Sequence, residues 1–318
     1  MNMPLIVITD CGFPSTAEEE RIVTRAGMRL EVLQCRTPAE VAAQAAHADA
    51  LINQHVRLTR EALRALTRCK AIVRYGVGVD NVDVTAATQL GIAVCNVPDY
   101  GVGEVAEHAL ALALALNRQL PQLDRRLRGG VWSYSPPASL QSFAELTFAT
   151  AGFGRIARAL HEKIRGLGCR RIACDPFVDD AVFEQAGVRR VQGDALFAQA
   201  DILSLHLALT DSTRHFVNET RLRQMKPRAI LINTARGGLV DTVALARALQ
   251  AGALAAAGLD VFEEEPPPAD HPIFQAPNTI LTSHNAYYSD ASIARLQRWA
   301  AEEAVRAVQG APLRCRVN

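Results

Sequence analysis

The sequence lacks any hydrophobic stretch long enough to cross a membrane. Its longest uninterrupted apolar run, Ala109–Leu116, has eight residues, whereas a membrane-spanning helix needs about 20. The first residues, Met1-Asn2-Met3-Pro4, also lack the basic start and the apolar core of a secretory signal. We therefore expect a cytoplasmic protein with no membrane partner.

An excess of charge of one sign is also lacking. Lys and Arg number 34 against 33 Asp and Glu, which gives a net charge of +1. Such balance provides no general field to attract nucleic acid, so we expect no nucleic-acid partner. Hydrophobic residues make up 49% and charged residues 21% of the 318 residues. These values are ordinary for folded proteins, and the length predicts about two domains.

Cysteine is sparse and follows no ligand pattern. The seven cysteines are scattered, odd in number and contain no CxxC pair. This is typical of reduced thiols in a cytoplasmic protein rather than of a disulfide framework. Because no group of Cys and His has the spacing of zinc ligands, we expect no metal site.

Short β-rich runs alternate with helical stretches over the first hundred residues. This alternation is typical of a parallel sheet covered by helices. Helices are predicted within 16–26 and at Pro38–Ala46, Thr59–Leu66 and Asp83–Gln89. Strands are predicted at Leu5–Thr9, Arg29–Leu33, Ala50–Asn53, Ala71–Arg74 and Ile92–Val94. These elements form a complete small α/β unit.

The next segment, Val102–Leu120, is predicted to be one long buried helix that connects two domains. Its core alternates Ala and Leu, which are both apolar and both strong helix formers. An irregular loop is expected at Gly129–Gln141, and an amphipathic helix at Ala291–Gln309. Between them the alternation resumes, with strands at Thr147–Ala151, Arg171–Cys174, Val188–Arg190, Ile202–His206, Ala229–Asn233, Ala255–Gly258 and Thr279–Thr282.

A glycine-rich segment follows the predicted strand Thr147–Ala151 and opens a helix. The residues Gly152-Phe153-Gly154-Arg155-Ile156-Ala157 fit the pattern G-x-G-x-x-[G/A] of dinucleotide-binding folds. Gly152 permits a tight turn, Gly154 leaves room for a pyrophosphate, and Ala157 lets helix and sheet pack closely. The free N–H groups at the start of such a helix favour phosphate binding.

An acidic residue follows at the position that binds the adenosine ribose in such folds. Asp175 comes directly after the predicted strand Arg171–Cys174, and seventeen residues separate it from Ala157. A carboxylate there accepts hydrogen bonds from ribose hydroxyls and repels a 2′-phosphate, which favours NAD as cofactor. The alternative is a turn-forming Asp before Pro176. The earlier Gly76-Val77-Gly78 lacks the third small residue and is not interpreted as a second dinucleotide site.

Polar segments follow three later strands: Asn233–Gly238, Asp260–Pro266 and Thr282–Asn285. Ligands in open α/β sheets bind beyond the carboxyl ends of the strands, where these segments are expected. Reduction of a 2-keto acid needs a guanidinium for the carboxylate, a proton donor, and a carboxylate that keeps the donor charged. Arg236, His284 and Glu265 are of these three types. Taken singly, they are equally typical of a surface turn, a structural histidine and a solvated acidic loop.

Together these motifs resemble the family of D-isomer-specific 2-hydroxyacid dehydrogenases, nearest its C-terminal-binding-protein-like branch. The resemblance implies an NAD-dependent enzyme that interconverts a small 2-keto acid and its D-2-hydroxy acid by hydride transfer. It also favours a homodimer, with the long apolar helix near 102–120 as a subunit surface. Matching segments cover almost the whole chain: Val73–Asn81, Val105–His108, Gly152–Ala157 with Asp175, Leu205–Leu207, Asn233–Gly238, Gly258–Phe262 and His284.

The resemblance implies roles for individual residues. Arg236 binds the substrate carboxylate, His284 is the acid–base group, and Glu265 orients and charges His284. Val77 and Gly78 contact the substrate through their backbone. The implied cofactor contacts are Gly152, Phe153, Gly154, Arg155, Ile156, Asp175, His206, Thr210, Asn233, Thr234, Ala235, Asp260 and His284.

Two segments depart from the family's pattern. Phe148-Ala149-Thr150-Ala151 stands where a glycine-rich strand usually enters the fingerprint, although small residues are retained. Asn285-Ala286-Tyr287-Tyr288-Ser289 follows His284, where many members carry two glycines. This second segment resembles the co-repressor-like branch, except for Tyr287 where a Trp is common, so we expect a reshaped substrate pocket.

The predicted fold is α/β, with two Rossmann-like doubly wound domains of parallel strands. A dinucleotide-binding domain, residues 100–285, is inserted into a discontinuous substrate domain of residues 1–99 and 286–318. The active site is expected in the interdomain cleft, where hinge closure would exclude water. Two other functions remain open: an NAD(H)-binding co-repressor or scaffold with little turnover, and a dehydrogenase of another acid such as formate or phosphite.

The substrate is expected to lack a phosphate group. Family members that act on phosphoglycerate resemble one another in carrying arginines just before the Thr that opens the third helix, and none carries over here. Asn53 and His55 occupy those positions, Arg57 is out of phase, and no long extension follows the last helix before Asn318. Because two extra negative charges need cationic partners, we expect glyoxylate, pyruvate or hydroxypyruvate. The polar Asn53 and His55 would favour a short or hydroxylated side chain.

Overall fold

The computed structural model describes residues 3–318, which divide into two compact units. One unit comprises residues 3–101 and 289–318, and the other comprises residues 102–288. The sequence placed these divisions slightly earlier, after residues 99 and 285. Met1 and Asn2, part of the segment expected to lack a secretory signal, lie outside the described residues.

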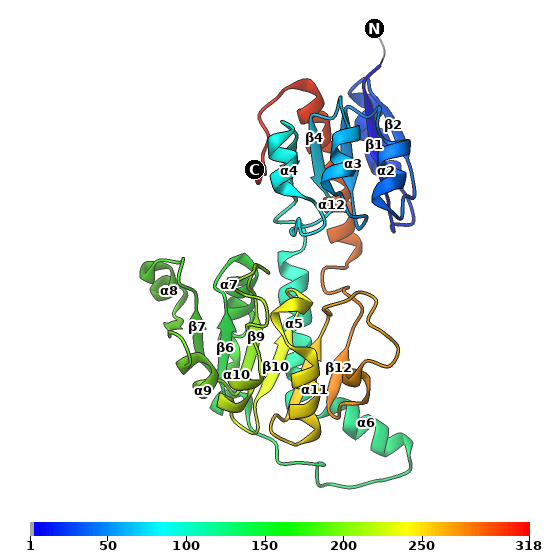
Figure 1. Cartoon of the computed structure of the whole chain (residues 1–318). Coiled ribbons are helices and arrows are strands. Elements are labelled where there is room, and N and C mark those ends of the chain that lie inside the picture. The colour runs from blue at the N-terminus through cyan, green and yellow to red at the C-terminus, as the bar shows by residue number, and fades with distance from the viewer. Residues whose placement is uncertain (1–2) are drawn as a thin grey trace. The chain divides into compact units, whose positions relative to one another are not determined.

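The first unit is built on a five-stranded parallel sheet with the order β2-β1-β3-β4-β5. Its strands are β1 Leu5–Ile8, β2 Arg29–Val32, β3 Ala50–Asn53, β4 Ala71–Arg74 and β5 Ala93–Cys95. Its helices are α1 Ala17–Arg25, α2 Pro38–Gln44, α3 Arg60–Ala65, α4 Val84–Gln89 and α12 Asp290–Gln309. Figure 1 shows α2, α3 and α4 on one face of this sheet, while α12 packs against α1, β3 and β4. The order is that of a doubly wound fold, as predicted.

Local sequence explains why these elements form. The strands β1, β3 and β5 are buried along their whole length, as expected of parallel strands covered on both faces. The side chains of Thr37, Thr59 and Asp83 accept hydrogen bonds from the first turns of α2, α3 and α4. Such caps satisfy otherwise unpaired N–H groups and fix where each helix begins.

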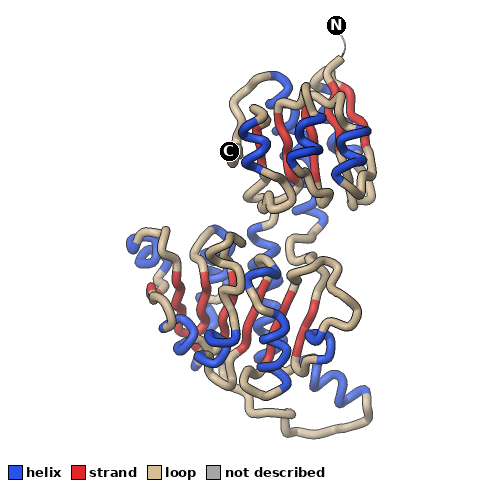
Figure 2. Tube along the Cα trace, in the orientation of Figure 1, coloured by secondary structure: helices blue, strands red, loops and turns tan. Residues whose placement is uncertain are grey.

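The second unit contains a seven-stranded parallel sheet with the order β12-β11-β10-β9-β6-β7-β8. The strand order reverses between β6 and β9, and ligands bind at the carboxyl ends beside such a reversal. Figure 2 shows the strands of this sheet side by side. Their bounds are β6 Thr147–Ala151, β7 Arg170–Cys174, β8 Arg189–Arg190, β9 Ile202–Leu205, β10 Ile230–Asn233, β11 Ala256–Leu259 and β12 Thr279–Leu281.

Two apolar cores cover the faces of this sheet. Alternate residues of β10 divide between them, since Ile230 and Ile232 face α5 and Leu231 faces α11. Figure 1 shows α10 and α11 on one side of the sheet, with α5 on the other. The helices are α5 Val102–Asn117, α6 Leu120–Arg128, α7 Arg155–Lys163, α8 Asp180–Ala186, α9 Ala195–Gln199, α10 Glu219–Gln224 and α11 Thr242–Gln250, with short 3-10 turns η1 Phe143–Glu145, η2 Arg165–Leu167, η3 Gly237–Leu239 and η4 Pro272–Gln275.

The helix predicted at Val102–Leu120 is in fact two helices. The first, α5, ends at Asn117, and Gln119 has a left-handed backbone (φ 53) before α6 starts at Leu120. On one face of α5, Ala111 is exposed and Leu114 and Ala115 are partly exposed, so the expected subunit surface stays a prediction. The opposite face packs into the core of its own unit. Five side chains of α5 are buried there: Ala106, Ala109, Leu112, Ala113 and Leu116. Within residues 3–318, no helix combines the length and apolar character needed to span a bilayer.

Candidate active site

The glycine-rich turn after β6 has the form that a dinucleotide loop requires. Gly152 has φ +91, and a Cβ there would lie 2.5 Å from the carbonyl oxygen of His206. Only glycine fits this position, because the turn after β6 passes directly against the end of β9. Gly154 is exposed, and a Cβ there would meet no atom within 4 Å. Arg155 and Ile156 then begin α7, so the start of this helix borders an open cradle.

Asp175 lies beside this turn. Its Oδ2 accepts a hydrogen bond of 2.8 Å from the backbone N–H of Phe153, and its Oδ1 accepts one of 2.9 Å from Phe177. The carboxylate therefore holds the glycine-rich turn against the end of β7. An ionised carboxylate has about four acceptor sites, so two remain for the hydroxyls of a ribose.

Two histidines lie beneath the same turn, of which His161 is buried and His206 is partly buried. Burial lowers the pKa of His161 to about 3 and that of His206 to about 4. The Nε2 of His161 lies 3.0 Å from the hydroxyl of Thr150, and the Nε2 of His206 lies 2.9 Å from the hydroxyl of Ser204. Both rings are neutral at pH 7. The predicted cofactor residue His206 thus contributes its backbone to the cradle and directs its ring to Ser204.

The segment after β10 turns sharply around a buried asparagine. The Oδ1 of Asn233 accepts from the backbone of Ala235 at 3.1 Å, and its Nδ2 donates to the carbonyl of Arg236 at 2.8 Å. Between them, the Oγ1 of Thr234 is buried without a hydrogen-bond partner among the described residues. Because buried hydroxyls are rarely left unpaired, this atom fits a polar group of a bound cofactor. Thr210, by contrast, lies in an exposed turn that it closes with Thr213.

Arg236 is presented by the tight turn η3. One terminal nitrogen of its guanidinium donates to the carbonyl of Ala235 at 2.6 Å. The next residue, Gly237, packs so closely that a Cβ would overlap the backbone of Phe262 and Glu263. The turn that carries Arg236 is therefore seated directly on the acidic loop after β11.

Asp260, predicted to contact the cofactor, also organises the segment after β12. Its side chain is fully buried, and its Oδ1 accepts from the hydroxyl of Thr282 at 2.6 Å and from the backbone of Asn285 at 3.0 Å. Its Oδ2 accepts from the backbone of Ala286 at 2.9 Å. The Nε2 of His108 on α5 lies 3.0 Å from the hydroxyl of Thr282. The motif Val105–His108 signalled this position, but no role was predicted for His108.

His284 and Glu265 make the contact that the resemblance implied. The Nδ1 of His284 lies 2.6 Å from Oε2 of Glu265, and Oε1 accepts from the backbone of Phe262 at 3.0 Å. Burial by itself raises the pKa of the Glu265 carboxyl. The hydrogen bond and charge of His284 outweigh burial, together with the backbone N–H of Phe262 and the charge of Arg236. The pKa of Glu265 therefore lies below its ordinary value. His284 has φ 52, and its N–H donates to the carbonyl of Asp260 at 2.6 Å. The paired residue is Glu265 rather than the exposed Glu264.

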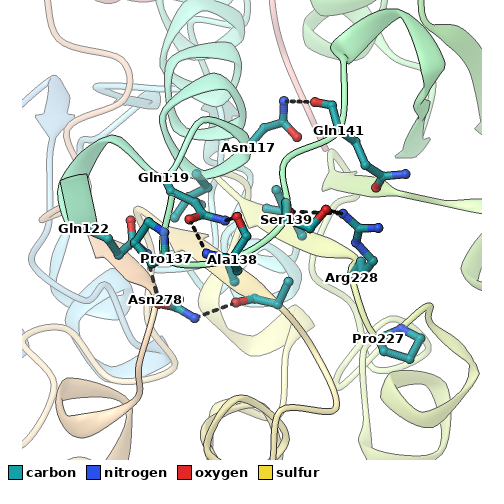
Figure 3. Close-up of a pocket in the computed structure, with 14 residues that line it drawn as sticks. Asn117, Gln119, Gln122, Pro137, Ala138, Ser139, Gln141, Pro227, Arg228 and Asn278 are labelled. Atoms are coloured by element: carbon teal, nitrogen blue, oxygen red, sulfur yellow. Dashed lines mark hydrogen bonds between the residues drawn. The ribbon is translucent and has the colours of Figure 1, made fainter. Parts of the chain in front are cut away.

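A cavity of about 370 Å³ lies at the opposite edge of this sheet, under the amino end of β10 at Ile230. Figure 3 shows that its polar wall is tied together from within. Gln119 exchanges two hydrogen bonds with Ala138, and Arg228 donates to Ser139. These polar groups already hydrogen-bond one another. We therefore assign the candidate active site to the edge of the sheet where the carboxyl ends of the strands lie, and not to this cavity.

In the first unit, the predicted substrate loop follows β4. The carbonyl of Val77 accepts from Nδ2 of Asn96 at 2.7 Å, and the side chain of Val77 is exposed. The guanidinium of Arg74 lies over Gly76, where a Cβ would overlap it. The sequence did not predict this cation beside Gly76, since Arg74 is the last residue of the predicted strand.

The expected role of Asn53 in selecting the substrate is wrong. Asn53 is fully buried, and its Nδ2 donates to the hydroxyl of Thr9 at 3.1 Å and to the carbonyl of Val56 at 3.0 Å. Its Oδ1 accepts from Asn81 at 2.7 Å. Its polar atoms therefore hold the loop after β3 together, while His55 is exposed.

Comparison with known proteins decides the family. Residues 110–286 match the family described as D-isomer specific 2-hydroxyacid dehydrogenase, NAD binding domain. The chain belongs to the D-isomer-specific 2-hydroxyacid dehydrogenase family. The match includes the glycine-rich turn, Asp175, Arg236, Glu265 and His284, so the second unit is the family's NAD-binding domain.

Individual relatives agree with this membership. A D-3-phosphoglycerate dehydrogenase of Archaeoglobus fulgidus is 34% identical over 96% of this chain. The match covers 58% of that relative, so the chain spans little more than half its length. Among solved structures, the TT0316 protein of Thermus thermophilus has a TM-score of 0.88 at 31% identity, covering 99% of this chain and all of that one. The D-lactate dehydrogenase of Aquifex aeolicus, complexed with NAD and lactic acid, has a TM-score of 0.88 at 28% identity over 96% of each chain.

No group of three metal-ligating side chains occurs within residues 3–318. Near His284 lie Glu265, whose Oε2 is 2.6 Å from Nδ1 of the ring, and Arg236, whose charge helps to lower the pKa of Glu265. Both belong to loops that follow neighbouring strands, β10 and β11.

The contact between His284 and Glu265 predicts how the pH profile of activity depends on Glu265. We propose that His284 donates the proton in keto-acid reduction, and a donor of this kind must begin the reaction charged. Activity should therefore fall as rising pH removes this proton. The lowered pKa of Glu265 keeps its negative charge present throughout that range. Glu265→Gln removes this charge and should move the fall in kcat to lower pH by about one unit. A nearby opposite charge shifts a side-chain pKa by about one to three units. We expect the lower end of this range, because both side chains are more than a third exposed and solvent screens their interaction.

The control for this experiment is Glu264→Gln, which changes the same charge on the same loop. Its pH profile of keto-acid reduction should coincide with that of the unmodified protein. A Glu265→Gln profile that also coincides would show that another group keeps His284 charged.

Proposed function

We propose that the chain is an NAD-dependent oxidoreductase that interconverts a small 2-keto acid and its D-2-hydroxy acid. The observation that carries this proposal is the 2.6 Å contact between His284 and Glu265. A histidine held by a carboxylate is a typical acid–base pair. The Arg236 turn, seated on the same acidic loop, supplies the cation that a carboxylate substrate needs.

Each residue has a defined task in this proposal. Arg236 binds the substrate carboxylate and fixes its orientation. Glu265 holds Nδ1 of His284, which leaves Nε2 of the ring to donate a proton to the substrate oxygen in reduction and to accept it in oxidation. Asp260 fixes the backbone that carries His284. NAD, when bound, supplies or accepts the hydride.

The residues present fit this cofactor. The turn Gly152–Ile156 offers an open cradle and a helix start for phosphates. Asp175 has acceptor sites left for ribose hydroxyls, and Thr234 has a buried hydroxyl that needs a partner. Asn233 and Ala235 form the turn that places Thr234.

We expect NADH to be preferred over NADPH by at least about tenfold in kcat/KM, which is about 1.4 kcal/mol. The carboxylate of Asp175 would repel a 2′-phosphate. Two arginines near Asp175 in sequence hydrogen-bond other groups rather than the space a 2′-phosphate would occupy. Arg170 donates to the carbonyl of Glu145, and Arg171 donates to the carbonyls of His161 and Gly187. Steady-state kinetics with both cofactors test this preference, and Asp175→Asn should reduce it. A higher kcat/KM with NADPH would contradict the role of Asp175.

The proposed substrate is a short keto acid without a phosphate, such as glyoxylate, pyruvate or hydroxypyruvate. This proposal is supported by the resemblance, which implies arginines in the phosphoglycerate enzymes of the family where this chain has Asn53 and His55. Arg74 is a cation beside the loop after β4, and it is the group to test if this proposal fails. Comparing kcat/KM for hydroxypyruvate and 3-phosphohydroxypyruvate decides the matter. A higher value for the phosphorylated compound would contradict the proposal.

We further infer a homodimer that uses the surface of α6 and the loop after it. Trp132 and Tyr134 meet edge to face there, with ring centroids 6.2 Å apart. Exposed apolar patches mark interaction sites, and aromatic residues are enriched in interface cores. A mass measurement by light scattering tests this, since Trp132→Ser should shift a dimer towards monomer and a monomeric unmodified protein would contradict it. The exposed apolar side chains are Leu120, Leu127, Val131, Trp132 and Tyr134.

A cytoplasmic location also remains a proposal. It is supported by seven free cysteines, because free thiols persist in reducing compartments. Burial raises the pKa of Cys69 and of Cys95 to about 12, which keeps these two thiols unreactive. Cell fractionation tests the location, and recovery in a secreted fraction would contradict it.

The experiment that tests the function is NADH oxidation with a panel of glyoxylate, pyruvate and hydroxypyruvate. The proposal predicts turnover with at least one of them. Tight NADH binding without turnover on the panel would instead favour the scaffold interpretation.

A further inference from the structure

Glu263 lies two residues before Glu265 and binds a second histidine. Its Oε2 lies 2.7 Å from Nε2 of His215. Its Oε1 accepts from the backbone N–H and the hydroxyl of Thr242, at 3.3 and 3.1 Å. The same hydroxyl lies 3.3 Å from Nε2 of His271. One carboxylate of the acidic loop thus joins segments that follow β9, β10 and β11.

These partners belong to the structure that presents Arg236. The N–H of His215 donates to the carbonyl of Gly238 at 2.8 Å, within the turn that follows Arg236. Thr242 begins α11 directly after that turn. Gly237 is seated on the backbone of the acidic loop at Glu263. Glu263 therefore connects the loop that carries Glu265 to the Arg236 turn at two points, through His215 and through Thr242.

The two histidines that bind the acidic loop share an unusual backbone. His215 has φ 50 and His284 has φ 52. A residue other than glycine rarely adopts this region and keeps it only where its surroundings fix it. For His215 those surroundings are Gly238 and Glu263, and for His284 they are Asp260 and Glu265.

The geometry points to Glu263 as a positioning residue that, with His215 and Thr242, holds the Arg236 turn and the Glu265 loop in register. This inference rests on the proposed roles of Arg236, Glu265 and His284. Glu263 acts through them, because a carboxylate bonded to both segments limits how far one can shift against the other. A displacement of about 1 Å in such a site lowers the rate by about 10².

The first test is the kinetics of Glu263→Ala. We expect kcat/KM for the keto acid to fall about ten- to hundredfold. The loss should be divided between a higher KM, because Arg236 is displaced, and a lower kcat, because Glu265 is displaced. The dissociation constant of NADH should not change. Glu264→Ala is the matched control, since Glu264 is exposed on the same loop, and it should leave all three quantities unchanged.

A second readout does not depend on turnover. Titration of the His284 ring by NMR should move to lower pH in Glu263→Ala, in the same direction as in Glu265→Gln, because the Glu265 contact is loosened. If the unmodified protein reduces no keto acid, the proposed function fails while this titration still tests the positioning. An unchanged titration together with a loss of thermal stability alone would overturn the inference. If Glu263→Ala does not fold, His215→Ala provides the same test, because it leaves the contact with Thr242 in place.

Discussion

Replacing His284 with Ala should lower kcat for keto-acid reduction by about 10²–10⁴. This is the contribution expected of a positioned acid–base group. The ring is held at 2.6 Å from Glu265 and its backbone is fixed by Asp260, so no neighbouring side chain can replace it without rearrangement. NADH should still bind without the contact implied for His284, because the glycine-rich turn and Asp175 are untouched.

The control for this experiment is His47→Ala. His47 is a surface histidine whose ring lies 3.4 Å from Glu31, so it also removes an imidazole beside a carboxylate. Its kcat should equal that of the unmodified protein. A His284→Ala protein that keeps more than a tenth of kcat would show that the proton comes from another group.

Arg236→Ala should lower kcat/KM for the keto acid by about 10²–10³, mainly through KM. Truncating one partner of a desolvated charge pair costs about 2–5 kcal/mol, and each 1.4 kcal/mol is about a factor of ten. Some loss in kcat is expected as well, since the substrate is no longer oriented. Steady-state kinetics measure both quantities.

Arg236→Lys separates charge from geometry. Lysine keeps the charge but cannot present two parallel N–H groups to a carboxylate. We therefore expect a kcat/KM between those of Arg236→Ala and the unmodified protein. An Arg236→Ala protein with an unchanged KM for the keto acid would contradict the carboxylate-binding role.

The sequence alone predicted most of the fold because parallel sheets have strong local signals. Buried strands such as Leu5–Ile8 are continuous apolar runs in the sequence, and glycine at residue 152 marks a turn that no other residue fits. The site residues Arg236, Glu265 and His284 could be named because each follows a strand, and carboxyl ends of parallel strands share one edge.

What the sequence could not show depends on contacts between distant segments. The left-handed backbone of His284 requires Asp260, 24 residues earlier, to accept its N–H. Asn53 looked available to a substrate, but Thr9, Val56 and Asn81 occupy its polar atoms.

The break between α5 and α6 was also missed. Ala and Leu continue the helical pattern up to Leu116, and the polar residues that follow carry no glycine or proline before Leu120. The chain turns at Gln119, where its side chain exchanges two hydrogen bonds with Ala138 in a later loop. Such a contact leaves no signature in the local sequence.

The most direct test of the central claim is the identity of the product formed from NADH and the keto acid that the protein reduces fastest. Chiral chromatography of the reaction mixture gives both the amount and the configuration. The proposed function predicts the D-2-hydroxy acid, formed in equal amount to the NADH consumed. Formation of the L-isomer, or no hydroxy acid from any member of the panel despite bound NADH, would contradict it.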